Sequence, residues 1–240
     1  MSFFAKAKNK LNEALCLCRI SATARLVRQH GLTYLPPSKL LTLENQARRV
    51  IRQGVKGDFC EFGLALGGSG IVLAKLLDAH RRFHGFDVFD MIPPPTSQKD
   101  DAHSLERYKT IAEGKSPGIK GKPYYGYEKN LFEKVQANFR SFGVKEGVQI
   151  QLHKGLFEET WPKLCSAIGN IALAHIDCDW YDPVAYCLAI CQEHMPSGGA
   201  IVVDDYYAYQ GARTATDEFI QANEDFTFID AGKHVVLLRH

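Results

Sequence analysis

Four aspartates that follow two predicted strands are the residues best suited to chemistry in this 240-residue chain. Asp177 and Asp179 lie in the run I-A-L-A-H-I-D-C-D-W-Y, and Asp204 and Asp205 lie in G-G-A-I-V-V-D-D-Y-Y. Each pair follows an apolar run that is typical of a buried parallel strand. Carboxylates gathered at one edge of a sheet repel one another unless a cation lies among them. The two pairs therefore predict a metal site and a reaction that uses it.

A hard divalent cation is the metal that such a donor set favours. Mg²⁺ prefers carboxylate oxygens and usually keeps open positions for water or substrate. If the two strands are neighbours, Asp177, Asp204 and Asp205 project from one edge and would bind the metal. A substrate with two adjacent hydroxyls would fill the open positions, and the metal would lower the pKa of the bound hydroxyl. Asp179 would then act as the general base.

Helix capping is the other explanation of the same aspartates. Asp179 precedes a predicted helix over residues 182–195, Asp182 is itself a favourable N-cap residue, and Asp205 could cap a turn. One such acid is commonplace, whereas two pairs at consecutive strand ends are less common, so the metal is the preferred hypothesis.

A glycine-rich turn, F-C-E-F-G-L-A-L-G-G-S-G, follows an earlier predicted strand. Gly63 and Gly67 let the backbone pass close to a ligand, and Glu61 could bind the ammonium of an amino-acid-like ligand. Asp87 ends the next strand, where an acid can accept hydrogen bonds from a ribose diol. The turn is neither a G-x-G-x-x-G pattern nor a P-loop, so S-adenosylmethionine fits better than NAD or ATP. Alternatively, the glycines only permit tight packing of helix on strand, and Asp87 is a capping residue.

The elements that position these residues alternate between strand and helix. Strands are predicted over 58–62, 82–87, 148–153, 171–177 and 200–204, with a closing hairpin over 226–239, and this alternation predicts an α/β, doubly wound, largely parallel sheet. Residues 1–55 form an N-terminal helical extension, with helices over 1–33 and 37–53. Residues 56–240 form a Rossmann-like domain. The stretch at about 93–126 is too long for a simple connection and is predicted to be a lid-like insertion.

Composition excludes several classes of protein. A net charge of +2 does not indicate a nucleic-acid partner, and no apolar run is long enough for stable membrane insertion. The N-terminus is a poor match to a signal peptide. Seven cysteines lack disulfide-framework spacing, so free thiols in a reducing cytoplasm are the simplest interpretation and zinc bound through sulfur is disfavoured. The apolar face of the first helix could dock on the main domain, touch a membrane surface or join two copies into a homodimer.

Five sequence motifs carry a resemblance to a known family. They are, in order, G-D-F-C-E-F-G-L-A-L-G-G-S, F-D-V-F-D-M-I-P-P-P, K-G-L-F-E-E-T-W-P, D-C-D-W-Y and S-G-G-A-I-V-V-D-D-Y. Together they resemble the macrocin O-methyltransferase (TylF/MycF-like) family of metal-dependent S-adenosylmethionine methyltransferases, over residues 57–220. The resemblance implies a class I methyltransferase-type fold and methylation of a hydroxyl, often on a deoxysugar.

The resemblance also implies roles for particular residues. Asp177, Asp204 and Asp205 would hold Mg²⁺, and Asp179 would be the base. The residues implied to contact S-adenosylmethionine are Glu61, Gly63, Gly67, Ser69, Asp87, Phe89 and Leu156. The chain departs from the family pattern at Leu66, Cys178, Trp180, Tyr206 and Tyr207, all near the expected acceptor.

The function that we predict is therefore an S-adenosylmethionine- and Mg²⁺-dependent O-methyltransferase acting on a sugar or another polyhydroxylated small molecule. Two other functions remain open. One is a protein that binds S-adenosylmethionine or another nucleoside without catalysis, and the other is a metal-dependent hydrolase on the same fold.

Overall fold

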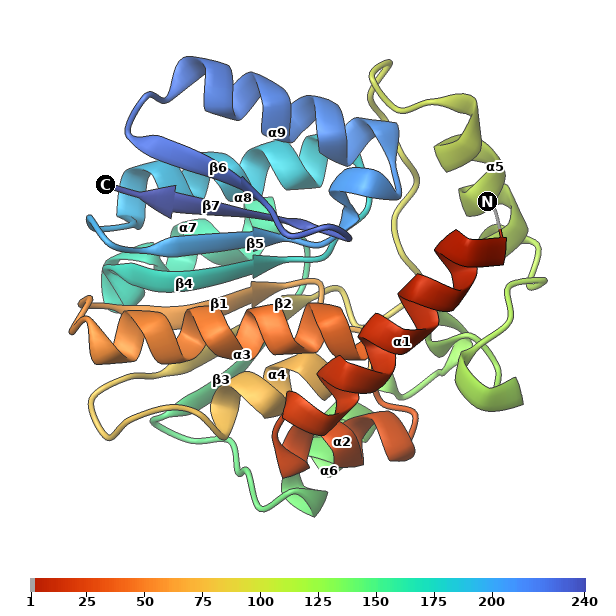
Figure 1. Cartoon of the computed structure of the whole chain (residues 1–240), viewed down its shortest axis with the longest axis horizontal. Coiled ribbons are helices and arrows are strands. Elements are labelled where there is room, and N and C mark those ends of the chain that lie inside the picture. Colours follow the sequence, from red (N-terminus) through yellow and green to blue (C-terminus); the bar gives the residue numbers. More distant parts are fainter. Residues whose placement is uncertain (1–2) are drawn as a thin grey trace.

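The computed structural model describes the backbone of residues 3–240 and the side chains from residue 8 onward. Within these residues, seven strands form one sheet in the order β3-β2-β1-β4-β5-β7-β6 (Figure 1). The strands are β1 (Asp58–Phe62), β2 (Phe83–Asp87), β3 (Ile150–Lys154), β4 (Ile171–Ile176), β5 (Ala200–Val203), β6 (Phe226–Asp230) and β7 (Val235–Arg239). The first five are parallel, and β7 runs antiparallel to both of its neighbours. The predicted doubly wound α/β fold is confirmed.

Helices cover both faces of this sheet because the central strands are apolar on both sides. All side chains of β1, β2, β4 and β5 are buried, so each face needs its own layer. One core includes side chains of α2 (Ala22–Gln29), α3 (Pro37–Arg52), α4 (Gly68–Ala74) and α6 (Leu131–Ser141). The other includes side chains of α7 (Phe157–Ile168), α8 (Tyr181–His194) and α9 (Gln210–Ala222).

The predicted single helix over residues 1–33 is wrong, because the chain forms two helices there. Residues 1 and 2 of that prediction lie outside the described part of the chain. Helix α1 (Phe3–Arg19) ends before Ser21, and Ser21 caps α2 by accepting a hydrogen bond from the Ala24 N–H at 3.0 Å. The Ser21 N–H donates to Glu44 of α3 at 3.0 Å. The break therefore lets α1 pack on α3 and α2 pack on α4.

The insertion lies beyond the carboxyl ends of the strands (Figure 1) and is fastened to α8. It contains α5 (Ala102–Ala112) and the short helices η1 (Ile119–Gly121) and η2 (Tyr125–Tyr127). The indole N–H of Trp180 donates to the Pro93 carbonyl at 2.9 Å, and the Tyr181 N–H donates to Asp100 at 3.0 Å. Trp180, not Asp182, is the N-cap of α8. The expected capping role of Asp182 is therefore wrong, and its carboxylate instead accepts from the Thr96 hydroxyl at 2.6 Å.

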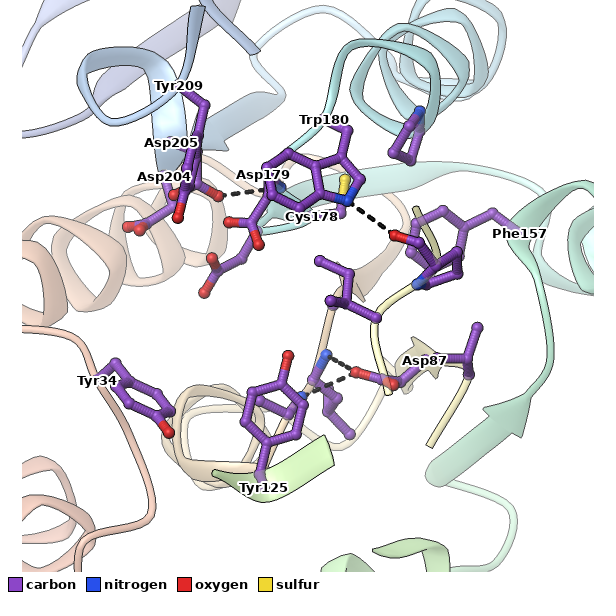
Figure 2. Close-up of a pocket in the computed structure, with 18 of the residues that line it drawn as sticks. Tyr34, Asp87, Tyr125, Phe157, Cys178, Asp179, Trp180, Asp204, Asp205 and Tyr209 are labelled. Atoms are coloured by element: carbon purple, nitrogen blue, oxygen red, sulfur yellow. Dashed lines mark hydrogen bonds between the residues drawn. The ribbon is translucent and has the colours of Figure 1, made fainter. Parts of the chain in front are cut away.

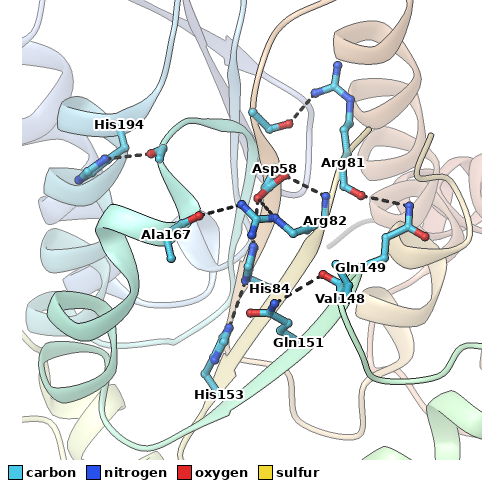
Figure 3. Close-up of polar contacts among 12 residues, drawn as sticks. Asp58, Arg81, Arg82, His84, Val148, Gln149, Gln151, His153, Ala167 and His194 are labelled. Carbon is cyan, nitrogen blue, oxygen red and sulfur yellow. Dashed lines mark hydrogen bonds and ion pairs between the residues drawn. The ribbon is translucent and has the colours of Figure 1, made fainter. Parts of the chain in front are cut away.

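A largely buried cluster of polar side chains links the neighbouring strands β1, β2 and β3 (Figure 3). His84 of β2 lies 3.1 Å from Asp58 of β1 and 3.1 Å from His153 of β3. Arg82 pairs with Asp58 at 2.9 Å and also donates to the Ala167 carbonyl at the end of α7. Because Asp58 is the first residue of β1, we interpret this cluster as a structural link between strands.

Candidate active site

The carboxyl ends of the strands open into a cavity of about 700 Å³. Strand order reverses between β1 and β4, which is the position where doubly wound sheets bind ligands. The walls come from the turn after β1, the ends of β2, β4 and β5, the start of α7, residues 32–39 and the insertion. The volume lies within the usual range of small-molecule and cofactor sites.

The four aspartates gather at this cavity because β4 and β5 are parallel neighbours. Ile176 pairs with Val203, so the residues that follow each strand emerge at the same edge. One carboxylate oxygen from each of Asp177, Asp179 and Asp205 lies within 4.8 Å of the others. Burial, together with the neighbouring carboxylates, raises the pKa of Asp177 well above its usual range and that of Asp205 to about 6. Such perturbed acids in a cleft are typical of functional sites.

Asp179 has an unusual backbone conformation for its residue type. Its φ is +61°, in the left-handed region that aspartate and asparagine tolerate better than most residues. Its N–H donates to Asp205 at 3.2 Å, and Figure 2 shows its carboxylate directed toward the other acids. Burial and the Asp205 charge raise the pKa of Asp179 well above its usual range. Trp180 is the N-cap of α8, and Asp100 accepts from the first N–H of that helix, so capping does not account for Asp179.

Asp204 has a partner that sequence reasoning missed. Lys39, near the start of α3, places its ammonium nitrogen 2.6 Å from Asp204 Oδ2 and 3.0 Å from the Asp204 carbonyl oxygen. Burial opposes the charge of Lys39, but Asp204 more than compensates, so the pKa of Lys39 is raised. The two residues are 165 positions apart, and no local pattern marks Lys39 as a site residue.

The residues at this edge fit a hard divalent cation. Asp204 Oδ1 is buried and has no hydrogen-bond partner among the described residues, although such atoms are normally satisfied. Carboxylate oxygens of Asp177, Asp179 and Asp205 gather at the same edge, and carboxylates are donors that Mg²⁺ prefers. A cation placed among them would satisfy the orphan oxygen and relieve the repulsion within the cluster.

The glycine turn after β1 touches the acidic loop directly. Gly63 has φ +92°, and a Cβ built there would lie 1.8 Å from the carbonyl oxygen of Asp177. Across the cavity (Figure 2), Asp87 holds the same turn. One of its oxygens accepts from the N–H groups of Leu64 and Ala65 at 2.7 and 2.9 Å, and the other accepts from Phe89 at 2.7 Å. Burial nevertheless leaves the pKa of Asp87 raised.

The predicted cofactor residues divide into two groups. Those that line the cavity are Gly63, Ser69, Asp87 and Leu156. Glu61, Gly67 and Phe89 are not among its described lining residues, and their contact with the cofactor stays a prediction. Glu61 is fully buried and pairs with His175 at 2.7 Å. Gly67 is the N-cap of α4, where a Cβ would lie 2.7 Å from the ring of Phe139.

Aromatic side chains form much of the remaining wall. Tyr34, Tyr124, Tyr125, Trp180 and Tyr209 all line the cavity. The rings of Tyr124 and Tyr125 lie 4.4 Å apart, and that of Tyr209 packs edge-on against Trp180 at 5.1 Å. Figure 2 shows Tyr34 and Tyr125 on the side of the cavity away from Trp180. The site thus combines an acidic floor, formed by Asp177, Asp179, Asp204 and Asp205, with the flat apolar faces of aromatic rings.

Comparison with known proteins gives one family and several relatives. A family model described as macrocin-O-methyltransferase (TylF) matches residues 19–232. A tetracenomycin-type rhamnosyl 4'-O-methyltransferase of Streptomyces olivaceus is 28% identical over 185 residues, which cover 75% of this chain and 64% of that relative. Mycinamicin III 3''-O-methyltransferase of Micromonospora griseorubida is 25% identical, over 78% of this chain and 69% of that protein. The aligned part is thus about two thirds of each relative's length.

Solved structures share the fold at lower identity. The O-methyltransferase NovP matches with a TM-score of 0.70 and 22% identity, over 87% of this chain and 82% of that one. TomG from Streptomyces achromogenes, solved with S-adenosylmethionine, matches with a TM-score of 0.57 and 14% identity over 93% and 89%. The fold is therefore that of the class I methyltransferases. None of the helices that the structure describes is both long and apolar enough to span a bilayer.

Proposed function

The chain belongs to the macrocin-O-methyltransferase (TylF) family, and from that premise we propose that it is an S-adenosylmethionine- and Mg²⁺-dependent O-methyltransferase. Its acceptor would be a hydroxyl of a sugar or another polyhydroxylated small molecule. One observation supports this most directly: the carboxylates of Asp177, Asp179 and Asp205, within 4.8 Å of one another, share a cavity with the turn that Asp87 holds. A donor site and a cation site thus meet in one space.

The methyl donor would lie along the glycine turn and Asp87. Gly63, Ser69 and Leu156 line the cavity there, and Asp87 keeps the turn in place through its three backbone hydrogen bonds. Four lone-pair sites on a carboxylate leave Asp87 capacity for one more hydrogen bond, as from a ribose hydroxyl. When bound, S-adenosylmethionine would supply the methyl group, and Mg²⁺ the positive charge that favours ionisation of the acceptor hydroxyl.

Asp179 is the residue to which we assign proton removal, and Asp177, Asp204 and Asp205 are the proposed metal ligands. A cation among the acids would lower the pKa of Asp179 from its raised value and keep its carboxylate ionised, as a general base must be. Its hydrogen bond to Asp205 and its positive φ fix the direction of the side chain. A hydroxyl resting on the acidic floor would lie within its reach, so that positioning supplies part of the rate.

The acceptor class is proposed from the walls of the cavity. Aromatic rings of Tyr34, Tyr125 and Trp180 offer flat apolar surfaces, which suit the less polar face of a sugar ring, while the acidic floor suits its hydroxyls. The names of two relatives, a rhamnosyl-tetracenomycin 4'-O-methyltransferase and mycinamicin III 3''-O-methyltransferase, place O-methylation on natural-product substrates of those proteins. We also propose a cytoplasmic location, since none of the cysteines in the described chain is paired.

The test begins with calorimetric titration of S-adenosylhomocysteine, with and without Mg²⁺. A radiolabelled methyl-transfer screen of glycoside acceptors follows. We expect binding of S-adenosylhomocysteine, Mg²⁺-dependent transfer, and loss of transfer in Asp179→Asn. A folded sample that binds no S-adenosylhomocysteine would refute the proposal. Turnover of an acceptor without S-adenosylmethionine would indicate the hydrolase, and binding of S-adenosylhomocysteine without transfer to any acceptor class would favour the non-catalytic binder.

A further inference from the structure

We propose that Lys39 is a built-in competitor of the divalent cation, holding Asp204 in the metal-free protein and weakening metal binding. This inference rests on the metal site of the proposed function. It concerns a residue that no sequence motif contains and that comes from α3, outside the strand ends that supply the acids. Lys39 would then set how tightly the protein binds the metal.

The geometry of Lys39 is that of a counter-ion. Its ammonium is 2.6 Å from Asp204 Oδ2 and 3.0 Å from the Asp204 carbonyl oxygen, so two of its three N–H donors serve one residue. The side chains of Lys39 and Asp204 are only 14% and 7% exposed. An ion pair this well shielded from water is screened far less than one on the surface. Lys39 therefore neutralises part of an acidic cluster that has no other described cation in contact with Asp204.

The ion pair leaves the site half satisfied. Asp204 Oδ1 is buried without a partner among the described residues, although Oδ2 of the same carboxylate is bound by Lys39. The three remaining acids, Asp177, Asp179 and Asp205, form the compact group within 4.8 Å, and Asp204 is not part of it. The structure thus separates the four carboxylates into three that lie close together and one that is engaged by a lysine.

A divalent cation that also binds Asp204 must share it with this ammonium. Like charges a few ångströms apart repel strongly inside a protein. Lys39 lines the cavity and has a flexible four-carbon stem, so its ammonium can withdraw from Asp204 into the cavity when the metal arrives. Breaking the ion pair costs free energy, which weakens metal binding. In the metal-free protein, the same ion pair reduces the repulsion among the four carboxylates.

The experiment compares Lys39→Met with Arg48→Met, a matched control. Methionine keeps most of the apolar stem of lysine, and Arg48 is an exposed residue of the same helix, so both variants lose one positive charge from α3. Mg²⁺ binding is titrated by calorimetry, and thermal unfolding is followed with and without Mg²⁺. We expect Lys39→Met to bind Mg²⁺ at least about tenfold more tightly, to melt earlier without metal, and to regain its stability with it. Arg48→Met should behave as the wild type.

Other outcomes overturn the inference in distinguishable ways. If wild type and Lys39→Met bind Mg²⁺ equally well, Lys39 is not a competitor, while the proposed metal dependence stands. If neither binds Mg²⁺ although both bind S-adenosylhomocysteine, the metal site itself fails and Lys39 with it. Lys39→Gln, which is neutral but can still donate to Asp204, replaces Lys39→Met should that variant not fold, with the same expected tightening. A Lys39→Arg variant that gains the same affinity would show that charge is not the cause.

Discussion

Replacing Gly63 by alanine tests whether the cofactor turn and the acidic loop form one unit. An added Cβ would lie 1.8 Å from the carbonyl oxygen of Asp177, where ordinary contact begins at 3.4 Å. That obstacle is backbone, which cannot rotate away as a side chain can. We expect Gly63→Ala to displace the loop that carries Asp177 or the turn that Asp87 holds, and therefore to weaken ligand binding at both.

The loss of stability expected for Gly63→Ala has two parts, which a control variant can separate. Alanine at positive φ costs about 1–2 kcal/mol, and overpacking a filled space costs roughly 1–3 kcal/mol more. Gly143 has φ +69° and no described atom within 4 Å of an added Cβ, so Gly143→Ala carries the first part alone. With about 2–4 °C lost per kcal/mol in a chain of this size, the difference between the two variants should be roughly 2–12 °C.

Differential scanning calorimetry of both variants measures this difference, and titration of S-adenosylhomocysteine measures the functional consequence. Gly63→Ala should bind S-adenosylhomocysteine at least about tenfold more weakly, whereas Gly143→Ala should bind it normally. If Gly63→Ala unfolds at the temperature of Gly143→Ala and binds equally well, the contact between Gly63 and Asp177 has no mechanical role and the reasoning fails.

Three further substitutions follow from individual contacts. Asp179→Asn tolerates the same positive φ and should lower methyl transfer about 10²–10⁴-fold with unchanged binding of S-adenosylhomocysteine; undiminished transfer would exclude Asp179 as the base. Asp87→Asn has one acceptor oxygen for three N–H donors and should cost about 1–3 kcal/mol in urea unfolding; a neutral result would contradict the role of Asp87 in the turn. His234 is buried with no described partner for either ring nitrogen, and burial lowers its pKa from 6.5 to about 4. Because the unfolded state then binds the proton more readily, stability present above pH 6.5 is lost as pH falls toward 4, by about 2 kcal/mol between pH 7.5 and 5. His234→Leu should lack that part of the loss, and an unchanged pH dependence would argue against it.

The sequence predicted that the four acids would lie together because their positions depend on short segments of the chain. A buried strand followed by two acids fixes where the carboxylates emerge, and parallel pairing of β4 with β5 then brings both pairs to one edge. The same reasoning placed Gly63 and Asp87 at the cavity. It also predicted strand β1 with its observed ends, Asp58–Phe62, because the segment lies between Gly57 and the glycine turn that begins at Gly63.

The sequence could not predict the orientation of the Glu61 side chain. Hydrophobic alternation tells which face of a strand is buried, but all five residues of β1 are buried, so the pattern contains no information about faces. Glu61 is fully buried, is not part of the described cavity lining, and pairs with His175 of the adjacent strand. Phe89 also lies outside the described cavity lining: its N–H donates to Asp87, and its ring packs on Phe132 at 4.8 Å.

Lys39 shows how the remaining part of the site depends on tertiary structure alone. A lysine three residues into a helix is an ordinary surface residue by sequence, and only the packing of α3 beside the end of β5 brings it to Asp204. The pairing of β1 with β4 places Gly63 against Asp177. The acids at the strand ends therefore contact both the turn after β1 and the ammonium of Lys39 from α3. These contacts are direct and leave no room for an intervening water molecule. A change in any one of the three must alter the electrostatic balance or the position of the others, which is why charge at Lys39 and volume at Gly63 are the two most informative places to perturb this protein.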